Sequence, residues 1–128
     1  MNEHDTVCVD LDGTLAKIDE KFFDPDWIGE PLPGALELLE RLEYREFRVV
    51  LFTCRMNNGL AYRGKLKPEE LIQQWLEHNH MDDYVDEIWE GHKPFARFFI
   101  DDRGITFQGG REGPSVERVL DIIDRTER

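Results

Sequence analysis

The sequence predicts a three-layer α/β domain in which a mainly parallel β-sheet is flanked by helices. Short apolar runs rich in β-branched and aromatic residues alternate with stretches of helical periodicity, an order typical of parallel sheets. Polar or acidic residues directly follow three of these apolar runs, where an open α/β sheet places its ligand site. At 128 residues the chain predicts a single domain, residues 1–128, with one core.

The first predicted strand carries the strongest chemical signal. The residues Val7–Val9 are consecutive apolar positions, typical of a strand buried on both faces. Asp10 and Asp12 follow two residues apart, and Gly13 gives the backbone freedom to turn away. Two carboxylates this close repel each other unless a cation is present or one holds a proton. One can then attack phosphorus while the other protonates the leaving oxygen, with Mg²⁺ offsetting the repulsion.

The string Asp10-Leu11-Asp12-Gly13-Thr14 after a hydrophobic strand resembles the first motif of the haloacid dehalogenase (HAD) superfamily, in its phosphatase branch. This resemblance implies a Rossmann-like domain that forms an aspartyl-phosphate on Asp10, with Asp12 as general acid and base. From the string alone, two other interpretations remain open. It can be an acidic strand-to-turn segment, or a carboxylate pair that binds a structural cation.

The segment of residues 15–33 is predicted to be an irregular excursion, because Pro and Gly recur in it too often for a long helix. We expect a surface loop pinned by Phe22, Phe23 and Trp27. In the resembled superfamily this segment is a short flap over the active site, and here it leaves no room for a cap domain. Pro33 is predicted to open a helix whose apolar stripe consists of Ala35, Leu38, Leu39 and Leu42.

A second buried strand is predicted over Phe47–Thr53. Its last residue, Thr53, matches the superfamily's second motif, whose hydroxyl holds a phosphoryl oxygen; a structural strand-end threonine is the simpler alternative. The following loop, residues 54–67, is basic although the chain has a net charge of −12. We interpret it as a loop that binds anions, with ordinary surface charge as the alternative. Its possible donors are Arg55, Arg63, Lys65 and Lys67, with Asn57, Asn58 and Tyr62.

The remaining chain is predicted to contain two helices and two strands. Pro68 opens one helix, and Ser115 caps the last one. A weak strand is predicted over Val85–Trp89, and a stronger one over Phe98–Ile100. In the resembled superfamily the last two motifs are a lysine that neutralises the phosphoryl group and an acidic pair that completes the Mg²⁺ site; they match Lys93 and Asp101-Asp102, respectively.

Charge and cysteine usage restrict the setting of the protein. The net charge of −12 opposes non-specific binding of nucleic acid, though a locally basic site can still bind a phosphate. Cys8 and Cys54 lie in or beside apolar runs, so we expect buried free thiols and no disulfide framework. The N-terminus lacks the pattern of a signal peptide and no apolar run reaches membrane-spanning length, so we expect a cytoplasmic protein with no membrane partner.

Together these features predict a Mg²⁺-dependent phosphomonoester hydrolase. The resemblance covers roughly residues 7–107. Within the superfamily the chain is similar to small capless members, and more weakly to the 3′-phosphatase half of polynucleotide kinase-phosphatases. It implies catalytic roles for Asp10, Asp12, Thr53 and Lys93, and metal ligation by Asp10, Asp12, Asp101 and Asp102. Substrate contacts are expected from Gly13, Thr14, Cys54, Arg55, Arg63 and Lys65.

Three alternatives stay open for the function. The substrate can be a small molecule, or it can be a nucleotide or a nucleic-acid 3′-end. A phosphotransferase would use the same residues with an alcohol as acceptor. A non-catalytic binding module with the same fold is the third alternative. From the sequence we expect no obligatory protein partner.

Overall fold

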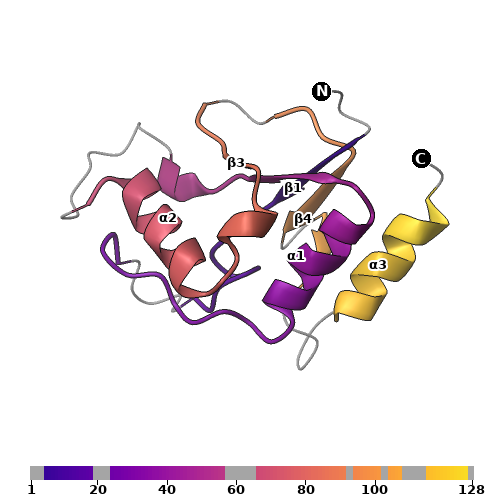
Figure 1. The fold of residues 1–128 in the computed structure, drawn as a ribbon, viewed down its shortest axis with the longest axis horizontal. Helices are drawn as coiled ribbons and strands as arrows, with labels where there is room; N and C mark the ends of the chain where they lie inside the picture. Colours follow the sequence, from indigo (N-terminus) through magenta and orange to yellow (C-terminus); the bar gives the residue numbers. More distant parts are fainter. Residues whose placement is uncertain are drawn as a thin grey trace.

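The computed structural model describes residues 5–18, 24–56, 66–91, 94–101, 104–107 and 115–126. Within these ranges the regular elements, in chain order, are β1 (Thr6–Val9), α1 (Ala35–Tyr44), β2 (Arg48–Leu51), the 3-10 helix η2 (Cys54–Met56), α2 (Pro68–His78), the 3-10 helix η3 (Asp82–Tyr84), β3 (Glu87–Ile88), β4 (Phe98–Asp101), β5 (Ile105–Thr106) and α3 (Val116–Arg125). Figure 1 shows the helices packed beside the strands. None of the described helices has the length and apolar character needed to cross a membrane.

The described strands form one sheet in the order β3-β2-β1-β4-β5, and each neighbouring pair is parallel. The predicted α/β domain with a parallel sheet flanked by helices is therefore confirmed. β1 lies at the centre, and its last residue, Val9, is in register with Leu51 of β2 and Ile100 of β4. Because the strands are parallel, the residues that follow all three meet at one edge of the sheet.

One face of the sheet packs against the helices. Val7 and Val9 of β1 are both 0% exposed and point to this face, since side chains alternate along a strand. They belong to one hydrophobic cluster to which all three described α-helices contribute. From the helices this cluster includes Ala35, Leu38, Leu39, Leu42, Ile72, Trp75, Leu76, Val116, Val119, Leu120 and Ile123.

The opposite face carries the alternate strand residues. Cys8 and Val50 are buried there, in register with each other, and lie outside the helix-packed cluster. The connection from β3 to β4 must pass β2 and β1, and a right-handed crossover takes it over this second face. In Figure 1 the described parts of this connection and α1 lie on opposite sides of β2.

Local signals predicted two of the three helix starts. α2 begins at Pro68, and Ser115 caps α3 by accepting a hydrogen bond from the Arg118 backbone N–H at 3.4 Å. The predicted start of α1 at Pro33 is wrong, because the helix begins at Ala35. Gly34 adopts φ 85°, a left-handed conformation that no helical residue has, and a Cβ at Gly34 would lie 2.8 Å from a methyl group of Val116.

Further predictions differ from the structure. The strand expected over Phe47–Thr53 is limited to Arg48–Leu51. The strand expected over Val85–Trp89 is limited to Glu87–Ile88, and β5 was not predicted. Trp27 does not pin the excursion of residues 15–33, since it is 64% exposed, whereas Phe22 and Phe23 lie outside the described residues. The described parts of the excursion are irregular, as predicted, apart from isolated bridges that join Ala16 to Asp12 and Pro31.

Candidate active site

Asp10 lies at the end of the central strand and is held by its neighbours. Its backbone N–H donates to the carbonyl of Ile100 at 3.0 Å, which continues the β1–β4 ladder by one residue. Its Oδ1 accepts a hydrogen bond from the Leu11 backbone N–H at 2.8 Å. These contacts fix both the backbone and the carboxylate of Asp10 at the edge where β1, β2 and β4 end.

A tight turn follows and positions Asp12. The carbonyl of Leu11 accepts the N–H groups of Thr14, Leu15 and Ala16 at 2.9–3.1 Å, and the N–H of Gly13 donates to the carbonyl of Ala16 at 2.8 Å. Thr14 is 0% exposed, and its hydroxyl has no hydrogen-bond partner among the described residues. The substrate contacts predicted for Gly13 and Thr14 stay predictions.

A small hollow opens where the three strands end. It measures about 120 Å³ and is lined by Cys8, Asp10, Phe52, Cys54, Phe99, Ile100 and Asp101. Asp10 stands two residues after Cys8, and Asp101 two after Phe99, so both carboxylates share the sheet face that the helices do not cover. Two carboxylates from different strands thus line one hollow, beside an apolar wall that contains two phenylalanines.

The end of β2 contributes a buried hydroxyl and an exposed thiol. Thr53 is 5% exposed; its Oγ1 accepts from the Arg55 N–H at 3.2 Å and its carbonyl from the Met56 N–H at 3.1 Å. The phosphoryl contact assigned to Thr53 stays a prediction. The expectation that Cys54 is buried is wrong, because η2 turns this side chain out to solvent at the hollow, whereas Cys8 inside the strand is buried as expected.

The guanidinium of Arg55 forms a bidentate ion pair with Asp12. Nε lies 2.7 Å from Oδ2 and Nη2 lies 3.0 Å from Oδ1. The side chains of Arg55 and Asp12 are only 6% and 15% exposed. Arg55 also donates to two carbonyls of the excursion, that of Asp24 from Nη1 at 3.1 Å and that of Trp27 from Nη2 at 2.8 Å. Its predicted substrate contact stays a prediction, and these donors are engaged within the protein.

Asp101 is the last residue of β4, directly before the short link to β5. Its Oδ1 accepts a hydrogen bond from the N–H of Gly104. A Cβ at Gly104 would lie 2.4 Å from the carbonyl oxygen of Phe99, so the chain passes too close for any side chain there. The described residues contain no cluster of three or more metal-binding side chains, and the predicted ligand Asp102 lies outside them. Lys93, Arg63 and Lys65 also lie outside the described residues, as do Asn57, Asn58 and Tyr62.

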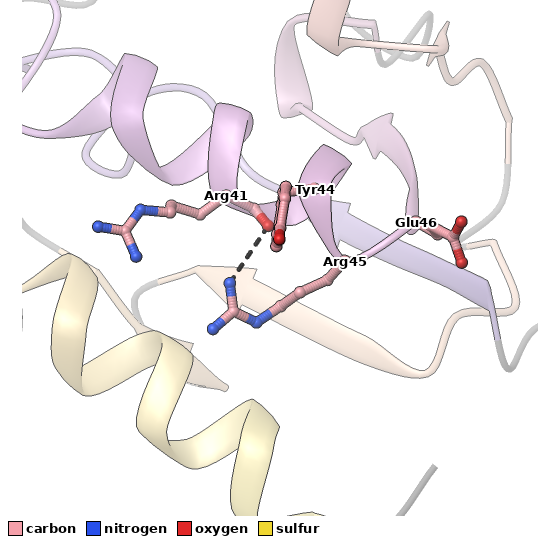
Figure 2. A pocket seen from close by; sticks show the side chains of 4 residues that line it. All are labelled: Arg41, Tyr44, Arg45 and Glu46. Atoms are coloured by element: carbon pink, nitrogen blue, oxygen red, sulfur yellow. Dashed lines mark hydrogen bonds between the residues drawn. The ribbon is translucent and has the colours of Figure 1, made fainter.

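A larger hollow at the C-terminal end of α1 lacks this chemistry. It measures about 450 Å³ and is lined by Arg41, Tyr44, Arg45 and Glu46 (Figure 2). Arg45 donates to the carbonyl of Arg41 at 3.4 Å and pairs with Asp124 of α3. The hydrogen bonds that Arg45 donates to the Asp124 carboxylate raise the pKa of the guanidinium above its ordinary value, and this pair joins the end of α1 to α3. We therefore place the candidate site at the smaller hollow.

Sequence reasoning missed two features of the site. It did not assign Arg55 to Asp12, because a basic residue after a strand can meet any of several anions in the folded chain. It also missed the apolar wall formed by Phe52 and Phe99, for which a signal existed. Phe99 stands two residues before Asp101 in β4, and Phe52 stands two residues after Val50 at the end of β2, so side-chain alternation directs both to the face that the described helices do not cover.

Comparison with known proteins supports the fold. No protein-family model and no curated protein matches the chain. The structure is similar to that of a conserved protein coded by a locus of Bacteroides thetaiotaomicron, with a TM-score of 0.52 and 22% identity over 96% of this chain and 92% of that one. A likeness at this level of identity concerns the α/β architecture alone.

A second solved structure is a D,D-heptose 1,7-bisphosphate phosphatase from B. bronchiseptica complexed with magnesium and phosphate. The TM-score is 0.49 and the identity 24%, with 70% of this chain and 51% of that one covered. The chain thus spans about half of that protein, and the similarity is too low to carry an argument about function.

Proposed function

We propose that this protein is a Mg²⁺-dependent phosphomonoester hydrolase that acts through an aspartyl-phosphate on Asp10. The observation that carries the proposal is the meeting of Asp10 and Asp101 at one hollow, with the Asp12–Arg55 pair in the turn directly after Asp10. A nucleophilic carboxylate, an acid or base and an oxygen donor for a hard cation are the groups that phosphoryl transfer by this route requires.

The residues present fit a magnesium ion in their donor chemistry. Mg²⁺ prefers carboxylate and carbonyl oxygens and keeps several waters, so it needs few protein ligands. Asp10 and Asp101 supply carboxylates at the same hollow. The carbonyl of Asp12 and the carboxylate of Asp102 would complete the set. When bound, the ion would offset the charge on the phosphoryl oxygens and the repulsion between the carboxylates.

Asp10 would attack phosphorus and form the aspartyl-phosphate as the ester P–O bond breaks. The leaving oxygen would take its proton from Asp12. Water would then attack phosphorus and give its proton to Asp12, which releases inorganic phosphate and restores the Asp10 carboxylate. Thr53 and Lys93 would hold the phosphoryl oxygens where negative charge develops.

The ion pair with Arg55 is compatible with this sequence of steps. Both oxygens of Asp12 accept from Arg55, at 2.7 and 3.0 Å. Each carboxylate oxygen has a second lone pair, so Asp12 can carry the proton for the leaving oxygen while both contacts to Arg55 persist.

The proposal is tested by phosphate release from a panel of aryl, sugar and nucleotide phosphates and 3′-phosphorylated oligonucleotides, with and without Mg²⁺. We expect activity that requires Mg²⁺ and is lost in Asp10→Asn, since the amide keeps the shape of the carboxylate but cannot attack phosphorus. Asp121→Asn on the exposed side of α3 is the matched control and should behave like wild type. Full activity in Asp10→Asn would refute the mechanism.

The same assay separates the role of Asp12 and the identity of the acceptor. Asp12→Asn should lose more activity on esters with poor leaving groups than on activated aryl phosphates, which need little protonation. Equal losses on both would argue against Asp12 as the acid. Release of inorganic phosphate in the presence of an added alcohol indicates a hydrolase, whereas a phosphorylated alcohol as main product indicates the phosphotransferase alternative.

A further inference from the structure

We propose that Arg55 is a positioning residue that clamps the segment Asp24–Trp27 onto the Asp12 carboxylate, so that this segment and the acid/base group move as one unit. The inference rests on the proposed function for the role of Asp12. It goes beyond that function by assigning to Arg55 a task other than substrate binding, and by connecting the excursion to the chemistry.

The geometry of the guanidinium carries the inference. All three of its nitrogens donate to protein oxygens: Nε to Asp12, Nη1 to Asp24 and Nη2 to both Asp12 and Trp27. Nη2 is therefore a single atom that lies 3.0 Å from the Asp12 carboxylate and 2.8 Å from the Trp27 carbonyl. With a side chain that is 6% exposed, Arg55 is built into the protein at this point.

The backbone of Arg55 is attached to the end of β2. The backbone N–H of Arg55 donates to the Thr53 hydroxyl at 3.2 Å, and the 3-10 helix η2 starts directly after the buried Thr53. Arg55 therefore connects three segments that are far apart in sequence: the end of β2, the turn after β1 and the excursion. Movement of Asp24–Trp27 would pull on a carboxylate oxygen of Asp12.

The rest of the excursion is held independently of Arg55. The indole N–H of Trp75 in α2 donates to the carbonyl of Gly29 at 2.8 Å. The Lys17 N–H donates to the carbonyl of Glu30, and the Leu32 N–H to that of Leu15, both at 2.8 Å. These bonds fix the excursion from Gly29 onward, so a loosened clamp should affect Asp24–Trp27 and leave the rest in place.

This arrangement predicts which kinetic constant depends on Arg55. Because its donors bind protein oxygens, loss of Arg55 should not weaken substrate binding. It should instead misplace Asp12, and a misplacement of about 1 Å can cost about 100-fold in rate. Lysine should not substitute, since a single ammonium group cannot match the bidentate fork or reach both carbonyls.

The test compares Arg55→Ala and Arg55→Lys with Arg45→Ala, which removes the second bidentate arginine pair of the described residues, at the end of α1. We expect kcat on an aryl phosphate to fall about 100-fold in both Arg55 variants with KM within about twofold of wild type, and partial recovery of Arg55→Ala by added guanidinium ions. Arg45→Ala should retain wild-type kinetics. A raised KM with unchanged kcat would overturn the inference, since Arg55 would then be a substrate ligand, and so would unchanged kinetics.

Amide hydrogen exchange supplies a readout that does not depend on activity. The amides of Asp26 and Trp27, which donate to Asp24, should exchange about tenfold faster or more in Arg55→Ala, while the amides of Lys17 and Leu32 stay protected as in wild type. Equal exchange in the two proteins would refute the clamp even if activity falls. If instead the exchange changes as expected but Asp10→Asn keeps full activity, the proposed function fails while the contact between Arg55 and the segment stands.

Discussion

Two bidentate arginine–aspartate pairs occur in the described part of the protein, and they differ in almost everything except their geometry. Arg55 reaches Asp12 at 2.7 and 3.0 Å, and Arg45 reaches Asp124 at 2.9 and 2.8 Å. The first pair is 6% and 15% exposed and lies where the strands end. The second is 19% and 52% exposed and joins the end of α1 to α3.

The surroundings of such a pair, and not the contact itself, decide what it does. Removing two charges from water is costly, so a buried pair is a poor way to gain stability. An exposed pair costs little and contributes little. The pair at the strand ends therefore needs a reason other than stability, and the carboxylate of Asp10, two residues before Asp12, suggests a chemical one.

The largest expected difference between the two pairs concerns stability. Arg55→Met should lower the free energy of unfolding by about 3 kcal/mol, because it leaves a nearly buried carboxylate and two carbonyls without their donor. Arg45→Met should cost less than about 1 kcal/mol, since water can replace the lost contact. Urea denaturation of the two variants against wild type measures both values, and equal losses would show that burial does not separate the pairs.

A second prediction concerns the backbone beneath Asp101. Gly104→Ala should cost about 2 kcal/mol, because the new methyl group meets the Phe99 carbonyl oxygen, and it should raise the Mg²⁺ concentration needed for half-maximal activity by moving a ligand. Gly29→Ala is a matched control, since its methyl group would meet the Lys17 carbonyl oxygen away from Asp101. A Mg²⁺ requirement that rises equally in both variants would remove Asp101 from the metal site.

The smallest expected effect is a difference in stability between variants of two buried hydroxyl groups, those of Thr14 and Thr53. Thr14→Val should change the free energy of unfolding by less than about 1 kcal/mol in either direction, because the Thr14 hydroxyl has no partner among the described residues. Thr53→Val should lower the free energy of unfolding by about 1 kcal/mol more than Thr14→Val does, since it removes the acceptor of the Arg55 N–H. Thermal denaturation of the two valine variants gives the order, and a larger loss at Thr14 would indicate that its hydroxyl makes a contact.

Much of the fold follows from local sequence signals. Val7–Val9, with three successive apolar residues, predicts the central strand, and Pro68 and Ser115 mark helix starts because their chemistry acts within a single turn. β5 has only two residues and no periodicity, so pairing with β4 alone defines it. α1 starts after Gly34 because this residue has a left-handed backbone and packs too closely against Val116 to carry a side chain. Neither feature could be predicted from the local sequence.

Some features of the candidate site likewise follow from local sequence, whereas others depend on contacts that only the folded chain makes. Asp10, Thr53 and Asp101 were predicted because each directly follows or ends an apolar run, and parallel strands bring such residues to one edge. The partner of Arg55 was not predictable, since Asp12 lies 43 residues earlier and only the folded chain brings the two together. Cys54 was expected to be buried by analogy with its apolar neighbours, but the strand had already ended, and η2 turned it outward.

The proposed mechanism depends most directly on Asp10 as the nucleophile. Brief reaction with a phosphate ester and Mg²⁺, followed by acid quench and reduction with sodium borohydride, converts an aspartyl-phosphate to homoserine, which peptide mass spectrometry locates. We predict homoserine at position 10, dependent on both the ester and Mg²⁺, and absent from Asp10→Asn. Homoserine at Asp12 or Asp101 instead, or its absence from position 10 in a protein that turns over the ester, would contradict the account.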